Sequence, residues 1–257
     1  MKEFFKKIKE FIVNMLEVIE ENEVVEEPIL KPLEEEITKE PITKQEETKQ
    51  TVGKPKTTQK EVYTMLTNKQ RQTYLKALGL YTKTIDNTRG TGQKKAEKQF
   101  NIIFLNKKSK TYTEETDKLL RKIYASYNKS KYMVDTDWQY FKNFKKTEYK
   151  CKCKGKYCNG YPSGIAMKLV MADQYQRNYY GTSVSLTSGI RCEKHNKNVG
   201  GTSNSYHKKG RASDSITKGK SSATVRNMIY KNSSTKLPFV SYSYDITKDS
   251  MHKTVDL

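Results

Sequence analysis

The 257-residue sequence lacks any run of 18 or more apolar residues, and only 34% of its residues are hydrophobic. A transmembrane helix needs about 20 consecutive, mostly apolar residues, so the sequence predicts no membrane-spanning segment. The N-terminus is basic, but Glu17, Glu20 and Glu21 interrupt its apolar residues and no small-residue cleavage site follows. These features argue against a secretory signal peptide.

Cysteine and histidine are scarce, with four cysteines and three histidines in the whole chain. The cysteines are Cys151, Cys153, Cys158 and Cys192. Their Cys-x-Cys-x4-Cys spacing differs from the paired Cys-x-x-Cys motifs of zinc ribbons. Three states of the cysteines therefore stay open at this point: a structural zinc site, two disulfides, or buried thiols.

Acidic residues are outnumbered, since 49 basic and 29 acidic side chains give a formal net charge of +20. The first 50 residues contain 14 acidic and 8 basic side chains and carry −6, so the remaining 207 residues carry +26. A surface of this charge attracts polyanions such as nucleic acid, anionic lipid or an anionic cell wall. The charge by itself does not choose among these partners.

The N-terminal quarter divides into two segments. Residues 1–27 predict an amphipathic helix, because apolar residues recur at steps of three and four. Its lysines crowd the N-terminal end and its glutamates the C-terminal end, which opposes the helix dipole. We therefore expect a protein partner or self-association to stabilise this helix. Residues 28–60 hold four of the six prolines and few apolar residues, which predicts a flexible linker.

The remaining sequence predicts two structural regions. Residues 61–130 show three short helical patterns, around Lys69–Leu78, Thr91–Phe104 and Thr113–Tyr124, and predict a small all-α module. Residues 131–257 predict an α+β domain built on an antiparallel sheet. Its expected helices are 163–180 and 223–230, and its expected strands lie at 184–187, from Ser205 onward, at 239–245 and at 252–257.

Metal-ligand chemistry concentrates between residues 187 and 216, where His207 and Asp214 lie seven residues apart. A zinc hydrolase combines neutral imidazole and carboxylate ligands with one coordination position left open for water. Two ligands do not complete such a site. His252 is the only histidine outside this stretch, and Asp249, three residues earlier, is positioned in sequence to act as a base. His195 competes with His252 for the place of third ligand.

The same residues carry a family resemblance. The motifs are Ser188-Gly-x-Arg-Cys192, His195-Asn196, Gly200-Gly201, Ser205-x-His207 and Gly210-x-Ala-x-Asp214. Their order resembles the zinc D-Ala-D-Ala carboxypeptidases and L-alanyl-D-glutamate endopeptidases, which cut peptidoglycan stem peptides. The family usually has bulky apolar residues just before its last histidine, where this chain has Ser250-Met251.

The resemblance implies a role for each site residue. It implies that zinc is held by His207, Asp214 and His252, with His195 outside the metal site. It also implies that Asp249 is the general base, that Arg191 stabilises the anionic tetrahedral intermediate, and that Ser205 lies beside the substrate. The helical patterns of residues 61–130 resemble peptidoglycan-binding modules that accompany such enzymes.

These resemblances predict a zinc-dependent peptidoglycan peptidase, with a phage lysin as one form of it. Without a signal peptide, we expect such an enzyme to reach the wall by host lysis or on a phage particle. Two alternatives come from other classes: a non-catalytic wall-binding protein and, less favoured, a basic nucleic-acid-binding protein. The sequence leaves the cleaved bond open between the terminal D-Ala bond, the L-Ala-D-Glu bond and a cross-link.

Overall fold

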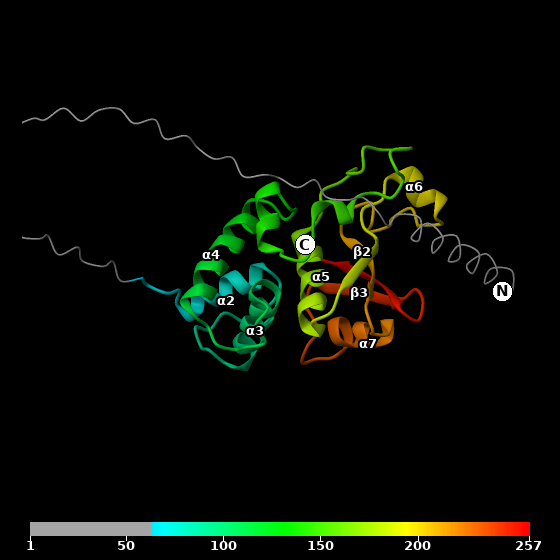
Figure 1. Ribbon diagram of the computed structural model, residues 1–257. Coiled ribbons are helices and arrows are strands. Elements are labelled where there is room, and N and C mark those ends of the chain that lie inside the picture. The colour runs from blue at the N-terminus through cyan, green and yellow to red at the C-terminus, as the bar shows by residue number, and fades with distance from the viewer. Residues whose placement is uncertain (1–62) are drawn as a thin grey trace, which may run out of the picture. The chain divides into compact units, whose positions relative to one another are not determined.

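The computed structural model describes residues 63–257 (Figure 1). The predicted helix of residues 1–27 and the predicted linker of residues 28–60 lie outside the described residues. Within residues 63–257, no helix combines the length and the apolar character that a membrane crossing requires.

The described helices and strands follow one another in a helical half and then a sheet-containing half. In chain order they are α2 (Asn68–Ala77), α3 (Thr91–Leu105), α4 (Glu114–Lys129), the 3-10 helices η1 (Asp135–Tyr140) and η2 (Lys146–Tyr149), α5 (Met167–Tyr180), β1 (Val184–Ser188), α6 (Glu193–Asn198), β2 (Ala212–Thr217), α7 (Ser222–Arg226), the π-helical turn η3 (Asn227–Lys231), β3 (Val240–Asp245) and β4 (Ser250–Val255).

The three helices predicted before residue 130 are present, and two of them begin at side-chain caps. The Thr67 hydroxyl accepts a hydrogen bond from the backbone of Gln70 at the start of α2, and the two residues form a capping box. Thr113 caps α4 in the same way, by accepting from the backbone of Thr116. Such caps satisfy backbone N–H groups that have no partner within the helix.

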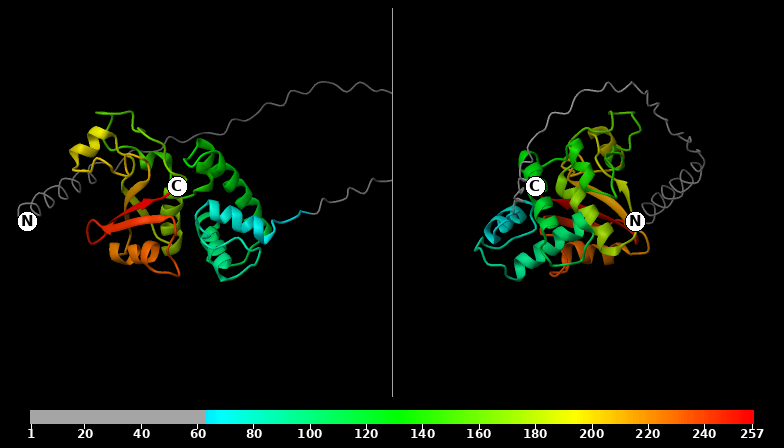
Figure 2. Two further views of the ribbon diagram at one scale, coloured as in Figure 1. Left: turned by 180° about the vertical axis from the view of Figure 1, so that it is seen from behind. Right: turned by 60° about the vertical axis from the view of Figure 1, so that its left-hand side comes forward.

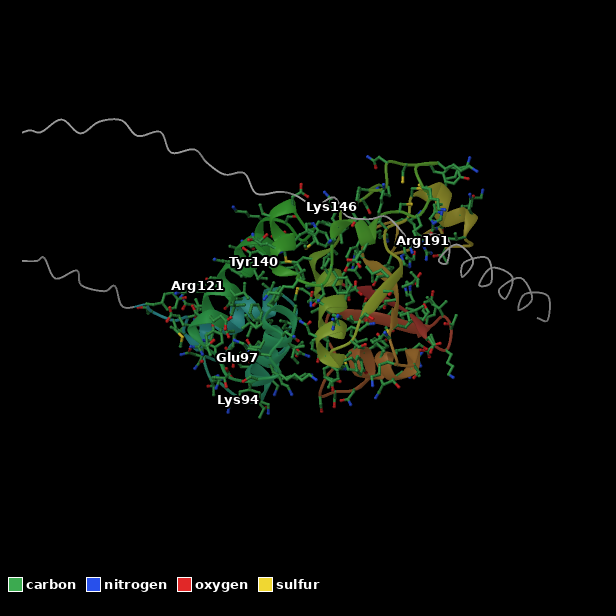
Figure 3. The ribbon with its side chains drawn as sticks, in the orientation of Figure 1. Lys94, Glu97, Arg121, Tyr140, Lys146 and Arg191 are labelled. Atoms are coloured by element: carbon green, nitrogen blue, oxygen red, sulfur yellow. The ribbon has the colours of Figure 1, made fainter. Side chains whose placement is uncertain are left out.

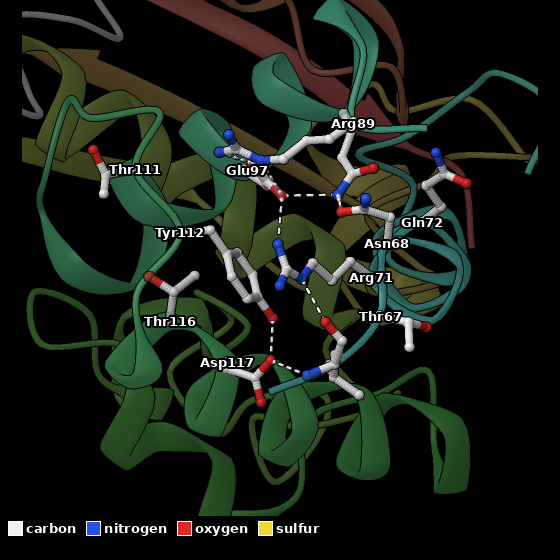
Figure 4. A network of polar contacts seen from close by, with 12 residues as sticks. Thr67, Asn68, Arg71, Gln72, Arg89, Glu97, Thr111, Tyr112, Thr116 and Asp117 are labelled. Carbon is white, nitrogen blue, oxygen red and sulfur yellow. Dashed lines mark hydrogen bonds and ion pairs between the residues drawn. The ribbon is translucent and has the colours of Figure 1, made fainter. Parts of the chain in front are cut away.

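Buried carboxylates join these helices to each other (Figure 4). Glu97 of α3 is fully buried and pairs with Arg89 at 2.7 Å. Asp117 of α4 is also fully buried and accepts hydrogen bonds from the Tyr112 hydroxyl and the Leu66 backbone, each at 2.8 Å. Because an unpaired buried charge is costly, these contacts fix the loops between the helices.

The sheet has the strand order β1-β2-β4-β3, with antiparallel pairing throughout. The predicted α+β class with an antiparallel sheet is therefore confirmed. In the register of the sheet, Asp214 of β2 lies opposite His252 of β4, which in turn lies opposite Tyr244 of β3. Directly paired residues point to the same face of a sheet. Asp214, His252 and Tyr244 therefore share one face.

Helix α5 packs on the opposite face of the sheet (Figures 1 and 2). Lys253, the neighbour of His252, points toward α5 and pairs with Asp173 at 2.6 Å. Ser213, the neighbour of Asp214, donates to the same carboxylate at 3.1 Å. Successive residues of a strand face opposite sides. Ser213 and Lys253 therefore point toward α5, whereas Asp214 and His252 point to the other face of the sheet.

The helical half and the sheet share one hydrophobic core. The Asn178 amide of α5 donates to the backbone carbonyls of Ile102 and Ile103 in α3, at 2.7 and 3.1 Å. Buried apolar residues form one continuous cluster that runs from Leu66 to Val255. The predicted boundary near residue 130 therefore separates helix-rich from strand-containing sequence but does not separate two cores.

Two features differ from the sequence prediction. The strand expected to start at Ser205 is wrong: the backbone N–H groups of Lys208 and Gly210 donate to the carbonyls of Ser205 and His207, which forms consecutive turns, and β2 begins only at Ala212. Gly210 has φ +64°, and a Cβ at this position would lie 1.7 Å from the Gly164 carbonyl oxygen. The short helix α6 was not predicted.

Candidate metal centre and active site

Three side chains from separate parts of the sheet half converge on one point. Asp214 and His252 come from the paired strands β2 and β4, and His207 comes from the turns before β2. His207 Nε2 lies 3.3 Å from Asp214 Oδ1 and 3.3 Å from His252 Nδ1. His252 Nδ1 lies 2.7 Å from the same Asp214 oxygen. The structure thus brings together the three residues that the sequence pattern singles out as metal ligands.

The donor set fits a zinc ion. Zinc binds imidazole nitrogen and carboxylate oxygen at about 2.0–2.1 Å, so ligand atoms of a tetrahedral site are separated by about 3.3 Å. Two of the three separations have this value, and the third is a hydrogen bond between Asp214 and His252. The side chains are buried, at 2–7% exposure, so their orientations are fixed by packing. The three residues can therefore form one face of a tetrahedron and leave its fourth corner open.

The ring orientation of His207 is set by the backbone at Gly189. His207 Nδ1 lies 2.7 Å from the Gly189 carbonyl oxygen, so this nitrogen carries the proton and Nε2 presents its lone pair to Asp214 and His252. Gly189 is needed for this contact because a Cβ there would lie 2.6 Å from the Tyr149 backbone. The adjacent Ile190 N–H donates to the Tyr149 carbonyl at 2.9 Å. The glycine thus permits the close approach that positions the first imidazole.

Arg191 fixes the orientation of the carboxylate. Its Nη2 donates to Asp214 Oδ2 at 2.6 Å, and its Nε donates to the Ser188 hydroxyl at 2.8 Å. Arg191, labelled in Figure 3, belongs to the segment that joins β1 to α6. Because Arg191 occupies Oδ2, the other carboxylate oxygen faces the two imidazoles.

The surroundings of Asp214 and His252 shift the pKa of each group in the direction that a metal site requires. Burial favours a raised pKa for Asp214, but its contacts with His207 and His252 outweigh burial and hold the pKa well below its usual value. Burial lowers the pKa of His252, although its hydrogen bond to Asp214 opposes this effect. Near neutral pH, Asp214 is therefore ionised and His252 is neutral.

The other predicted site residues lie outside this cluster. Asp249 is exposed in the turn between β3 and β4, one residue before β4 begins, and its N–H donates to the Thr247 hydroxyl. Ser205 lies in the turn that leads to His207, with its N–H bonded to the Thr202 carbonyl. His195 belongs to α6 and is not among the three metal-binding side chains.

The sequence prediction missed Tyr244. Its ring stacks on the His252 ring, with centroids 4.7 Å apart and an interplanar angle of 27°. Tyr244 is 42% exposed, so the stacked pair lies at the surface of the sheet. The alternating pattern of residues 239–245 predicts which β3 residues share a face. The pairing of Tyr244 with His252, however, depends on the register of β3 against β4.

A comparison with known families places this site. Residues 142–249 match the family model described as Peptidase M15. This region belongs to the M15 peptidases. No curated protein matches the chain. The M15 match includes His207 and Asp214 but ends before His252, so the place of the last histidine in the site rests on the geometry described above.

M15 peptidases are zinc-dependent metallopeptidases, and His207, Asp214 and His252 provide the matching metal-binding groups in this chain. The chemistry that zinc supplies at such a site is Lewis-acid activation of water and of the scissile carbonyl. Neighbouring residues orient these groups. The Gly189 carbonyl orients the His207 imidazole, and Arg191 orients the Asp214 carboxylate and adds positive charge. The Tyr244 ring lies against His252.

Proposed function

We propose that this M15 domain hydrolyses peptide bonds in the stem peptides of peptidoglycan, with zinc bound by His207, Asp214 and His252. The observation that carries the proposal is the separation of the three ligand atoms, 2.7–3.3 Å, within a region that matches the M15 family. Arg191 adds a fixed positive charge beside the metal position, where an oxyanion develops during amide hydrolysis. Its Nε and Nη2 are engaged with Ser188 and Asp214, which leaves Nη1 for the substrate.

Digestion of purified peptidoglycan tests this function and identifies the bond. We expect the full-length chain to release products that His207→Ala does not release, as measured by mass spectrometry. Free D-Ala would assign carboxypeptidase activity, a new N-terminal D-Glu would assign L-Ala-D-Glu endopeptidase activity, and opened cross-links would assign D,D-endopeptidase activity. An undigested wall that nevertheless retains the bound protein would contradict the proposal and favour the non-catalytic wall-binding alternative.

The role of a phage lysin is a narrower form of the same proposal. A lysin must act on assembled walls, so the wild-type chain added to intact sacculi should lower their turbidity. The His207→Ala variant is the matched control, because it keeps the basic surface while losing an imidazole ligand. Release of terminal D-Ala without a fall in turbidity would assign wall modification rather than lysis.

We propose Asp249 as the general base. The acidic residue that ends β3 and the one that follows β4 are engaged in ion pairs, Asp245 with Arg226 at 3.2 Å and Asp256 with Arg211 at 3.0 Å, whereas Asp249 is exposed in the β3–β4 turn. Catalytic hydrogen bonds often tighten only when the substrate binds, and a turn beside β4 can make that adjustment.

Asp249→Asn tests this assignment, because the amide cannot accept the proton. We expect zinc content to stay at the wild-type level while turnover falls by about 10²–10⁴-fold, the usual contribution of a general base. Asp256→Asn is the matched control, since it removes an exposed carboxylate at the opposite end of β4 from Asp249. Wild-type turnover in Asp249→Asn would assign the base to another group.

The proposal includes a substrate contact from Ser205. This residue lies two positions before His207 in the same series of turns. We therefore expect it to lie near a substrate that is bound at the metal position. Ser205→Ala should raise KM with little change in zinc content, and Ser203→Ala, an exposed residue of the same loop, is its control. An unchanged KM would remove Ser205 from the substrate site.

We further propose that helices α2, α3 and α4 form a wall-binding module. A pocket of about 390 Å³ in this region is lined by Arg71, Arg89, Lys94, Lys110, Thr111 and Tyr112. Four cationic side chains around one pocket favour an anionic group such as a stem-peptide carboxylate. Cosedimentation with insoluble peptidoglycan should weaken in the Lys94→Ala/Lys110→Ala variant. Lys122→Ala, an exposed lysine of α4, is the control, and equal binding of both variants would contradict this role.

A further inference from the structure

The four cysteines of the chain come together in a second cluster, separate from the His207, Asp214 and His252 site. Their sulfur atoms all lie within 4.8 Å of one another. Cys151, Cys153 and Cys158 come from the loop after η2, and Cys192 comes from the N-terminal cap of α6. Cys151, Cys153 and Cys192 are buried, and all four thiols are free.

The sulfur separations suit a shared metal ion and not a disulfide. A tetrahedral zinc ion binds thiolates at about 2.3 Å, which separates neighbouring sulfur atoms by about 3.8 Å. The Cys153 and Cys158 sulfurs are 3.4 Å apart, whereas a disulfide bond measures about 2.05 Å. The four sulfurs also surround one point from two chain segments, as the ligands of a closed structural site do.

Backbone N–H groups point at three of the sulfur atoms. The Cys192 N–H lies 3.3 Å from Cys151 Sγ, the His195 N–H lies 3.4 Å from Cys192 Sγ, and the Gly160 N–H lies 3.3 Å from Cys158 Sγ. Hydrogen bonds of this kind stabilise sulfur in its negative, metal-binding form. These backbone donors oppose the rise in pKa that burial causes at Cys151 and Cys158.

The charge around the cluster is also favourable. Four thiolates around one divalent cation leave two negative charges, and the loop carries Lys152, Lys154 and Lys156 between its cysteines. Basic neighbours favour the thiolate over the thiol. Four ionised sulfurs at these separations repel one another, and the positive charge of a divalent metal ion would offset that repulsion.

We propose that Cys151, Cys153, Cys158 and Cys192 bind a second zinc ion, which is structural. Its coordination is closed by four protein ligands, unlike the three-residue site with its open corner. The ion ties the loop of residues 151–158 to the start of α6. Because Cys192 directly follows Arg191, and Lys152 donates to the Leu186 carbonyl of β1 at 3.2 Å, the ion also holds the backbone on both sides of the metallopeptidase site.

Zinc stoichiometry of the full-length chain tests the proposal. We expect two zinc ions per chain in the wild type, one in Cys153→Ser/Cys158→Ser and one in His207→Ala/His252→Ala, as measured by elemental analysis after gel filtration. The two double variants separate the sites: a failed histidine site leaves the cysteine-bound ion in place, and the reverse also holds. A cysteine variant with the zinc content of the wild type would overturn the proposal.

A measurement on the unmodified protein covers the case in which the cysteine variant does not fold. Titration with a mercurial reagent blocks thiolates, and a chromogenic chelator reports released zinc. We expect one zinc ion per chain to be released as four thiols react, with the second ion remaining bound. Cobalt substitution adds a spectroscopic readout, because cobalt bound to thiolates gives an intense sulfur-to-metal charge-transfer band. Four reactive thiols without zinc release, or two disulfides, would contradict the proposal.

Discussion

The two faces of the sheet carry buried carboxylates with opposite surroundings. On the α5 face, Asp173 pairs with Lys253 at 2.6 Å and accepts hydrogen bonds from Tyr149 and Ser213. On the other face, Asp214 meets two imidazoles and Arg191. The first carboxylate is neutralised by a lysine that is itself fully buried. The second is arranged around a point that a divalent cation can occupy.

The difference originates in adjacent residues of the same strands. Ser213 and Lys253 point toward α5, while their neighbours Asp214 and His252 point to the other face. A shift of one residue in the register would exchange the two sets. The register that places Ser213 and Lys253 against Asp173 on the α5 face is therefore the same register that brings Asp214 beside His252.

Removing one of the three proposed zinc ligands should have the largest effect, and this effect should fall on zinc binding and turnover rather than on folding. We expect His252→Ala to lose zinc from the three-residue site and to lower turnover by at least about 1,000-fold, which equals roughly 4 kcal/mol of transition-state stabilisation. Turnover on peptidoglycan fragments and zinc content are the measurements. The fold should persist, because the α5 face keeps its ion pair, so a far-ultraviolet circular dichroism spectrum like that of the wild type is the control.

Removing Lys253 from the α5 face should lower the stability of the fold. Lys253→Met leaves Asp173 buried without its cation, so we expect the free energy of unfolding to fall by about 3–5 kcal/mol. Chemical denaturation is the measurement. The matched variant Asp173→Leu/Lys253→Met replaces both charges with apolar groups and should recover most of this loss. Equal stability of the single and double variants would show that the ion pair does not hold the register.

The sequence predicted the metal ligands better than their surroundings. The residue types single out His207 and Asp214, and the family resemblance adds His252; the structure brings these three side chains together. The three helices before residue 130 were found because their periodicity and caps are local signals. The sequence predicts a strand where the structure has turns at Ser205, since a short polar segment carries no periodic signal that separates a strand from a series of turns.

Contacts between distant residues were not predictable from spacing. Cys192 lies 34 positions after Cys158, so the Cys-x-Cys-x4-Cys pattern showed only three of the four residues of one cluster as neighbours. The stacking of Tyr244 on His252 and the contact of Gly189 with Tyr149 likewise depend on tertiary packing. Such contacts depend on strand register and on close approach of the backbone, neither of which produces a local pattern in a single sequence.

A conservative change at Arg191 should have a smaller effect, which is limited to the zinc affinity of the three-residue site. Arg191→Lys keeps the charge but not the fork that contacts Ser188 and Asp214 together, so we expect zinc affinity of the three-residue site to fall by about 10–100-fold. Competition with a chelator of known affinity measures this change. Arg211→Lys is the matched control and should leave zinc affinity unchanged, because Arg211, directly before β2, donates its Nε hydrogen bond to the Val255 carbonyl and not to Asp214.

The smallest expected effect is a loss of stability at acidic pH that arises from His252, on the face of the sheet opposite α5. Burial holds the pKa of His252 below the value of about 6.5 that histidine has in the unfolded chain, so below that pH the unfolded chain binds more protons than the folded one. His252 therefore costs no stability above pH 6.5 and lowers the free energy of unfolding as the pH falls below it. Urea unfolding of the wild type and His252→Asn, both with chelator present, measures this change. The wild type should lose more stability than the variant between pH 6.5 and 5, and parallel curves would show that the imidazole gains its proton without cost at its place against Asp214.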